Sequence, residues 1–444
     1  MADEGIVDEI ISTFFLNTCR LCPPPGKHVQ QAAVVCGALA SAQPGDDENG
    51  RLIPVVTGSV ADFYIEPILS DIDDIDILFH KSTELALPQG HRPPTQLPAE
   101  FHNYVRVFKI IDSHLPAYVY LKLRYLLTKC TDSGRYNAVE YEYQPFLGMF
   151  HDRFEHHEPA FLRHGEYMQF YDSFAYRGPA LTCSVNDMHL LPVDLVQCVR
   201  CLSWPSQAAD WPSRRRNYSW PESSTVDRVV SDGCDLVQTA HRQCRQDEVM
   251  SKHQWRLSFS RAEVTLINSW MPLQQIVYVM LRFFMKSQRL VGPDMLWSYH
   301  IKTLMLWACE MKPKSWWTDD LSLIRICVKL LHTLAIWLNT ERCPHYFVNH
   351  CNLFDNLFTL ELEMTASKLL SIDEDWLLSW FVNNYIRRSA ELCPESISWL
   401  FDDVIMPTSV AMRLQLGVSA VVDWRLKAVT SGTHHVSHIC VSTA

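Results

Sequence analysis

Apolar residues recur at helical spacing in the second half of the chain and at strand-like spacing in much of the first half. Stripes at intervals of three and four residues predict helices, and one of them starts at Pro272, because proline fits a first helical turn. Short β-rich runs between turn residues predict strands. The predicted helices cover 5–18, 28–42, 272–290, 298–311, 320–339, 354–370 and 374–392. The predicted strands cover 52–59, 75–79, 104–111 and 118–127, with a hairpin over 178–199 and a loop over 85–98.

Strands followed by helices predict an α+β chain, and its 444 residues exceed what one ordinary core accommodates. We therefore expect a sheet-containing lobe over 1–250, a helical lobe over 251–405 and a tail over 406–444. No apolar run reaches the roughly 18 residues that span a bilayer. The N-terminus does not resemble a signal peptide, and the 15 cysteines lack framework spacing. We expect a cytoplasmic protein with reduced thiols and no membrane contact.

The net charge of −11 argues against a protein that coats nucleic acid over its whole surface. The charge is uneven, because residues 251–330 hold 11 Lys/Arg against 5 Asp/Glu. This region either meets phosphate or is a helical lobe with solvated charges. The run "SRRRNY" (213–218) likewise contacts phosphate or forms a solvated loop, and we favour the loop. Further basic candidates are Lys252, Lys286, Arg289, Lys312 and Lys314.

Acidic residues gather at the start of the predicted strand 75–79, within the sequence "SDIDDIDILFH". Alternate residues of a strand face opposite sides, so Ile75, Ile77 and Phe79 share an apolar face. Asp74 and Asp76 then share the other face. Two unpaired buried carboxylates repel one another, and a divalent cation between them removes this repulsion.

Asp194 is the only charge in its apolar stretch, and it lies on a predicted strand that we expect beside the first. Three carboxylates with Mg²⁺ suit phosphoryl transfer, in which two ions stabilise the attacking and leaving oxygens. Gly58 and Ser59 suit a phosphate cradle, because glycine permits close backbone approach and serine donates hydrogen bonds. Alternatively, an acidic loop caps the strand and Asp194 is an isolated buried acid. The combined pattern favours the nucleotidyltransferase superfamily.

Three long stretches make the resemblance more specific: "WRLSFSRAE" (255–263), "SYHIKTLMLWACE" (298–310) and "TERCPHYFVNHCNLFDNL" (340–357). Together they resemble the cyclic GMP-AMP synthase family, including its invertebrate synthase-like receptors, and the related Mab-type developmental proteins. The resemblance covers roughly residues 1–405. It implies a bilobed nucleotidyltransferase fold with a mixed-sheet catalytic lobe and a helical-bundle lobe.

The resemblance implies roles for ten residues. Gly58 and Ser59 would bind the donor triphosphate, and Asp74, Asp76 and Asp194 would bind metal. Arg256 and Ser258 would contact the guanine of GTP. Arg282 and Ser298 would contact phosphate, and Tyr299 would stack on a base. The implied cofactors are two Mg²⁺ or Mn²⁺ ions. Three alternatives stay open: Arg256 bridges the lobes, Arg282 is a surface charge, and Tyr299 is a core aromatic.

The implied activity is the joining of ATP and GTP into a cyclic dinucleotide for innate immune, antiviral signalling. Its product would act on a stimulator-of-interferon-genes-type receptor, and residues 60–73 would form an activation loop. The vertebrate synthase carries a zinc insertion after the "WRLSF" stretch, which we expect to be helical, and this chain lacks that insertion. Double-stranded RNA is therefore the expected activator, ahead of DNA. The alternative is a catalytically silent Mab-type scaffold or binding protein.

Cysteine and histidine also gather in the sequence "CPHYFVNHC". Cys343, His345, His350 and Cys351 have ligand types that suit zinc, but the resemblance implies a structural helix-end motif here. The pairs at 19/22 and 198/201 do not replace the missing insertion.

Overall fold

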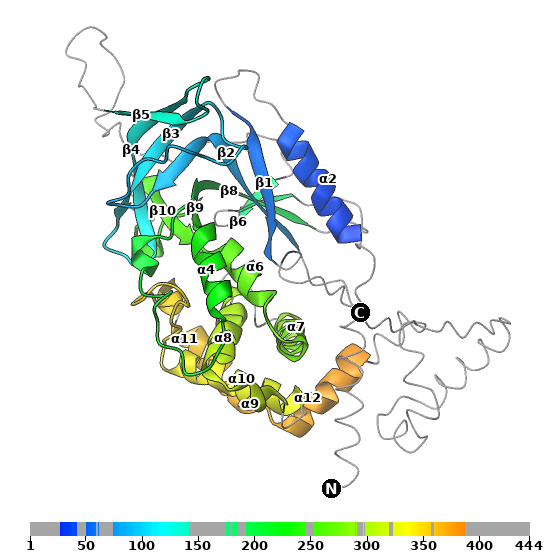
Figure 1. Ribbon diagram of the computed structural model, residues 1–444. Coiled ribbons are helices and arrows are strands. Elements are labelled where there is room, and N and C mark those ends of the chain that lie inside the picture. The colour runs from blue at the N-terminus through cyan, green and yellow to red at the C-terminus, as the bar shows by residue number, and fades with distance from the viewer. Residues whose placement is uncertain are drawn as a thin grey trace, which may run out of the picture.

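A twisted mixed sheet and a bundle of helices on one side of it make up the described part of the chain (Figure 1). The protein has the α+β, bilobed architecture that the sequence predicts. The computed structural model describes residues 27–41, 50–58, 61, 74–141, 174–177, 180–183, 192–244, 252–288, 290, 296, 298–318, 323–356 and 359–386. The helix predicted over 5–18 and the tail over 406–444 lie outside these residues, and so does the predicted activation loop over 60–73 except for residue 61.

The sheet is organised around strands β2 and β8, which pair in parallel. Hydrogen-bonded neighbours close a circuit β2–β3–β4–β10–β9–β8–β2, while β1, β5, β6 and β7 extend it. The strands are β1 Leu52–Thr57, β2 Ile75–Leu87, β3 Tyr104–Asp112, β4 Tyr118–Lys129, β5 Tyr136–Glu140, β6 Phe174–Arg177, β7 Ala180–Cys183, β8 Val193–Cys201, β9 Cys234–Gln238 and β10 Gln254–Ser258. The predicted hairpin over 178–199 is confirmed, because β7 pairs antiparallel with β8.

The helices of the second half continue the core of the sheet, because one hydrophobic cluster runs from Val119 and Trp255 into the helical bundle. The helices are α2 Lys27–Ser41, α4 Ser223–Asp232, α6 Ser260–Ile267, α7 Pro272–Ser287, α8 Ser298–Met311, α9 Lys314–Thr318, α10 Leu323–Asn339, α11 Thr359–Leu370 and α12 Glu374–Phe381. Helix α2 packs on the sheet away from this bundle and covers Ile75 and Ile77. None of the described helices combines the length and apolar character needed to cross a bilayer.

Strand β2 is longer than predicted, and the loop expected from residue 85 begins only after Leu87. The polar run His80–Glu84, which follows the predicted strand 75–79, is buried. Its charges are paired, since Arg106 Nη2 lies 2.7 Å and Lys81 Nζ lies 3.6 Å from Glu84 Oε1. Because its charges are paired, the strand continues through this buried polar segment.

The "WRLS" segment is a strand rather than the helix that we expected. As β10, it pairs with both β4 and β9, so the sheet continues past residue 250. Helix α6 begins directly after it. Strands β5 and β9 and helices α4, α6 and α9 were not predicted, because each is short and lacks a long periodic pattern.

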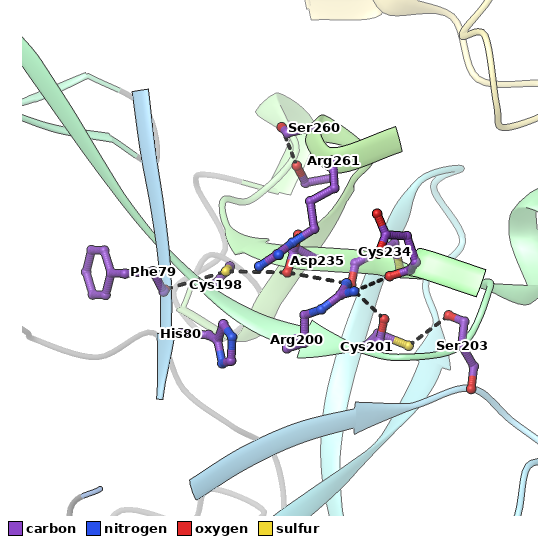
Figure 2. A network of polar contacts seen from close by, with 12 residues as sticks. Phe79, His80, Cys198, Arg200, Cys201, Ser203, Cys234, Asp235, Ser260 and Arg261 are labelled. Atoms are coloured by element: carbon purple, nitrogen blue, oxygen red, sulfur yellow. Dashed lines mark hydrogen bonds and ion pairs between the residues drawn. The ribbon is translucent and has the colours of Figure 1, made fainter. Parts of the chain in front are cut away.

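Asp235 on β9 joins the sheet to α6 (Figure 2). Its carboxylate is fully buried. Arg261 Nε of α6 donates to Oδ2 at 2.9 Å, and Arg200 Nη1 of β8 lies 3.7 Å from Oδ1. Arg200 also donates to the Cys234 carbonyl at 2.8 Å. Burial disfavours the charged form of Arg261, but the attraction of Asp235 prevails and raises its pKa. One carboxylate thus holds two strands and a helix together.

Glu310 on α8 forms a second buried ion cluster. Arg214 Nη2 lies 2.7 Å from Glu310 Oε2, and Arg216 Nε lies 3.3 Å from the same oxygen. The Tyr346 hydroxyl donates to it at 2.7 Å, and the Arg214 guanidinium lies 4.5 Å from the Trp307 ring centroid. The solvated loop favoured for "SRRRNY" is therefore wrong for Arg214 and Arg216, whose charges are neutralised inside the protein. Arg215 between them is exposed.

We predict that Asp235→Asn lowers the free energy of unfolding by about 3–5 kcal/mol, because it leaves two buried guanidinium groups facing a neutral amide. Urea unfolding followed by far-UV circular dichroism measures this change. Asp227→Asn on the exposed side of α4 is the matched control and should change stability by less than about 0.5 kcal/mol. Equal losses in both variants would contradict the stabilising role of the Asp235 carboxylate between Arg200 and Arg261.

Candidate active site

Asp76 and Asp194 lie side by side on the two central parallel strands, where their Cα atoms are register partners. Thr57 of β1 is the partner of Asp76 on its other side, and Thr182 of β7 is the partner of Asp194. Neighbouring strands are roughly 4.8 Å apart and register partners share a face, so two carboxylates meet in one polar row. Strand β8 therefore lies beside β2, as the sequence predicted.

Gly58 follows β1 and touches the carboxylate of Asp76. Its φ of +64° is in the left-handed region. A Cβ built on Gly58 would overlap the Asp76 carboxylate, so this position needs glycine for both its conformation and its space. Ser59, the other half of the predicted phosphate cradle, lies outside the described residues.

The pair Asp76–Asp194 has the ligand chemistry that a divalent cation prefers. Both residues are half-buried, and Oδ1 of Asp194 is buried. Asp74 directly precedes β2 and is also half-buried. Across the described residues, no three or more His, Cys, Asp or Glu side chains form a group that could hold a metal. The geometry thus brings together two of the three expected carboxylates.

Arg256 and Ser258 lie on β10, and both are half-buried. Ser258 is the register partner of Asp235, and its Oγ lies 3.0 Å from Ser260 Oγ at the start of α6. Helix α6 then runs toward the end of β1, since Asn268 Nδ2 beyond the helix end donates to the Ala61 carbonyl at 3.3 Å. Helix α6 therefore spans the distance between the end of β10, at Ser258, and the segment just after Gly58.

Ser298 and Tyr299 form the first turn of α8, and both are half-buried. The Tyr299 hydroxyl lies 3.3 Å from His345 Nε2. Lys302, one turn later, places Nζ 3.2 Å from Glu263 Oε2 of α6. Burial, with the nearby Glu263 charge, raises the pKa of Tyr299 well above its usual value. Tyr299 is thus a protonated phenol at the junction of α6, α8 and the segment after α10.

His345 is neutral and has a defined tautomer. Its Nδ1 accepts hydrogen bonds from the backbone N–H groups of Phe347 at 3.0 Å and Val348 at 3.1 Å. The proton therefore lies on Nε2, which donates to Tyr299. Burial, together with the charge of Arg256, lowers the pKa of His345 to about 3. Arg256 is close enough to Tyr299 of α8 and to His345 for its positive charge to lower the pKa of both side chains.

The cysteines around His345 are protonated thiols. Burial raises the pKa of Cys351 to about 12 and that of Cys343 further still. Both side chains therefore act as neutral buried groups around His345. In the part of the chain that is described, the sequence "CPHYFVNHC" forms no metal-binding group. Cys198 and Cys201, three apart on β8, face opposite sides, and Cys201 is the register partner of Cys234.

Arg282 lies on α7 and is half-buried, so it is not a freely solvated surface charge. Its guanidinium carbon lies 5.5 Å from the Tyr278 ring centroid. Sequence reasoning missed Asp235, Arg200 and Arg261. A signal existed for Asp235, because it is a lone charge in an apolar run, the same feature that singled out Asp194.

Two family models match adjacent parts of the chain. The Mab-21 protein nucleotidyltransferase domain matches residues 151–269, and the Mab-21 protein HhH/H2TH-like domain matches residues 272–371. The first match contains Asp194 and Arg256 and the second contains Tyr299, whereas Gly58 and Asp76 precede both. The fold and these matches make the chain similar to nucleotidyltransferase-type proteins.

Over residues 151–269 the chain is similar to the nucleotidyltransferase domain of Mab-21 proteins, and two curated mab-21-like proteins are similar to part of the chain. "Protein mab-21-like" of Drosophila melanogaster is 26% identical over 191 residues, which is 42% of this chain and 50% of the relative. "Protein mab-21-like" of Anopheles gambiae is 26% identical over 190 residues, which is 42% of this chain and 51% of the relative. The similarity spans about half the length of these curated relatives.

Gly58→Ala should lower the free energy of unfolding by about 2–5 kcal/mol, because alanine adds left-handed strain and an overlap with Asp76. Gly90→Ala is the matched control, since Gly90 has φ +84° but open space around its Cβ position. It should lose only the strain, about 1–2 kcal/mol. Chemical denaturation compares the two, and identical losses would show that contact with Asp76 contributes nothing.

Stability should fall as the pH drops below about 6.5, partly because of His345. The unfolded chain then protonates this histidine, whereas the folded chain resists protonation until about pH 3. The contribution is lost at up to about 1.4 kcal/mol per pH unit. His345→Asn should therefore show a shallower fall between pH 6 and 4 in urea unfolding. Parallel curves for the two proteins would contradict this assignment.

Proposed function

We propose that this chain is a nucleotidyltransferase that joins ATP and GTP into a cyclic dinucleotide such as cyclic GMP-AMP. The observation that supports this proposal is the in-register pair Asp76–Asp194. Beside it lies Gly58, a position that only glycine can occupy. A paired carboxylate row next to a close backbone approach suits phosphoryl transfer, which depends on positioning and on charge stabilisation.

Asp74, Asp76 and Asp194 would hold Mg²⁺ or Mn²⁺, which supplies positive charge to the attacking and leaving oxygens when bound. Gly58 and Ser59 would cradle the donor triphosphate, and Asp194 is the proposed acceptor of the ribose hydroxyl proton. Arg282 and Ser298 would contact phosphate. Arg256 and Ser258 would contact the acceptor purine, and Tyr299 would stack on a base.

Double-stranded RNA is the activator that we propose for an enzyme located in the cytoplasm, and a stimulator-of-interferon-genes-type receptor is the proposed target of the product. The support is the resemblance to synthase-like receptors and the direct passage from β10 through α6 into α7 without a zinc insertion. Recognition of duplex RNA by shape requires few base contacts. Activation by RNA and signalling through the product are proposed for the whole protein, not for the nucleotidyltransferase-like region alone.

A catalytically silent scaffold or binding protein is the second candidate. Two observations favour it: the described residues contain no three-ligand metal group, and the curated relatives are named mab-21-like. In such a protein the Asp76–Asp194 pair would bind a nucleotide or a partner without chemistry.

The test incubates the full chain with labelled ATP and GTP and Mn²⁺, with duplex RNA, duplex DNA or neither. We expect a cyclic dinucleotide that forms fastest with RNA. Asp194→Asn should lower its formation by roughly 100-fold or more, the scale of losing one electrostatic group from an active site. Mass spectrometry of the product measures the outcome.

Asp227→Asn serves as the control, since this exposed α4 residue lies outside the proposed site. Absence of product under every condition, from a folded protein, would favour the scaffold. Equal rates with and without RNA would refute activation but leave the chemistry standing.

A further inference from the structure

We propose that His345 is a positioning residue that holds the ring of Tyr299 ready for a purine base. The inference rests on the proposed function and adds to it a residue that never contacts the nucleotide. Its basis is the hydrogen bond between His345 Nε2 and the Tyr299 hydroxyl, which lie 3.3 Å apart.

The direction of this hydrogen bond is fixed by the backbone. Two N–H groups, from Phe347 and Val348, point at Nδ1 of His345 and leave it no role except acceptor. Nε2 must then carry the proton and donate to Tyr299. Because burial keeps His345 neutral, this arrangement does not change across physiological pH.

The segment that carries His345 is itself tightly held. The His345 N–H donates to the Cys351 carbonyl at 2.9 Å, and the Leu353 N–H donates to the Cys343 carbonyl at 2.8 Å. The Asn352 side chain accepts from the Cys343 N–H at 2.8 Å. A small bridged loop therefore presents the imidazole in one orientation, as a positioning role requires.

The same loop is attached to the helix that bears Tyr299. Trp307 Nε1, two turns further along α8, donates to the Pro344 carbonyl at 2.9 Å. The loop and α8 are thus joined at Trp307 as well as at Tyr299, and these two hydrogen bonds hold His345 beside Tyr299. This arrangement gives the sequence "CPHYFVNHC" a role other than metal binding.

A base that stacks on a ring already held in place loses less side-chain entropy on binding than one that must order the ring. Removing the His345 contact should therefore weaken binding of the base and leave binding of phosphate and ribose unchanged. One freed side chain corresponds to a loss of roughly 2- to 10-fold in affinity.

Two substitutions test the acceptor Nδ1 and the donor Nε2 of the imidazole separately. His345→Asn keeps an acceptor where Nδ1 accepts, so it retains the backbone bonds of the loop and loses the donor to Tyr299. His345→Gln keeps a donor where Nε2 donates. His350→Asn is the control, because this exposed loop residue has φ +60°, a conformation that asparagine tolerates.

The experiment measures dissociation constants of the full chain for ATP, GTP and ribose 5-triphosphate, which lacks a base. We expect His345→Asn to weaken binding of a purine nucleotide by roughly 2- to 10-fold without affecting ribose 5-triphosphate. His345→Gln should restore most of the loss, and His350→Asn should match the wild type. In a Tyr299→Phe background, His345→Asn should cause no further loss.

Unchanged purine affinity in His345→Asn would overturn the inference, and so would equal weakening for ribose 5-triphosphate. If His345→Asn does not fold, Tyr299→Phe alone must show the purine-selective loss, and its absence overturns the inference. A wild-type protein that binds neither purine nucleotide would overturn the proposed function and this inference together. The other outcomes would leave the proposed function intact.

Discussion

The parallel pairing of β2 with β8 is the constraint on which the candidate site depends. A slip of one residue would send Asp194 to the opposite face, where Ile75 and Ile77 pack against α2. The register is secured at its start, where the Ile75 N–H donates to the Pro192 carbonyl at 2.9 Å. A closed circuit of strands limits further sliding. The two carboxylates meet because the apolar face of β2 has only one way to be buried.

Helix α6 links the sheet to the helical lobe through two ion pairs. Arg261 ties α6 to Asp235 inside the sheet, and Glu263, on the same helix, pairs with Lys302 of α8. Both ion pairs are buried enough that solvent screens them little. Each is also costly to break, since the remaining partner would be an uncompensated charge. The sheet that holds the carboxylates and helix α8, whose first turn contains Tyr299, are therefore fixed relative to one another.

The sequence predicted those parts of the site whose signal is local. Asp194 stood out as a lone charge in an apolar strand, and the period of two on β2 placed Asp76 correctly with respect to its core face. The full length of β2 was missed, because pairing of Glu84 with Arg106 joins residues 22 apart. Arg214 was misjudged for the same reason, since Glu310 lies 96 residues away. Long-range compensation of charge leaves no trace in local pattern.

The two halves of the carboxylate pair have different kinds of support. Asp194 lies inside the matched nucleotidyltransferase region, which begins at residue 151, whereas Asp76 and Gly58 precede it. The place of Asp76 therefore depends on strand register and on the contact with Gly58, not on family likeness. Register is a physical property of this chain, and it pairs a residue outside the matched region with one inside it. A function assigned through Asp194 alone would leave the acidic cluster at the start of β2 without a reason for its place in the sheet.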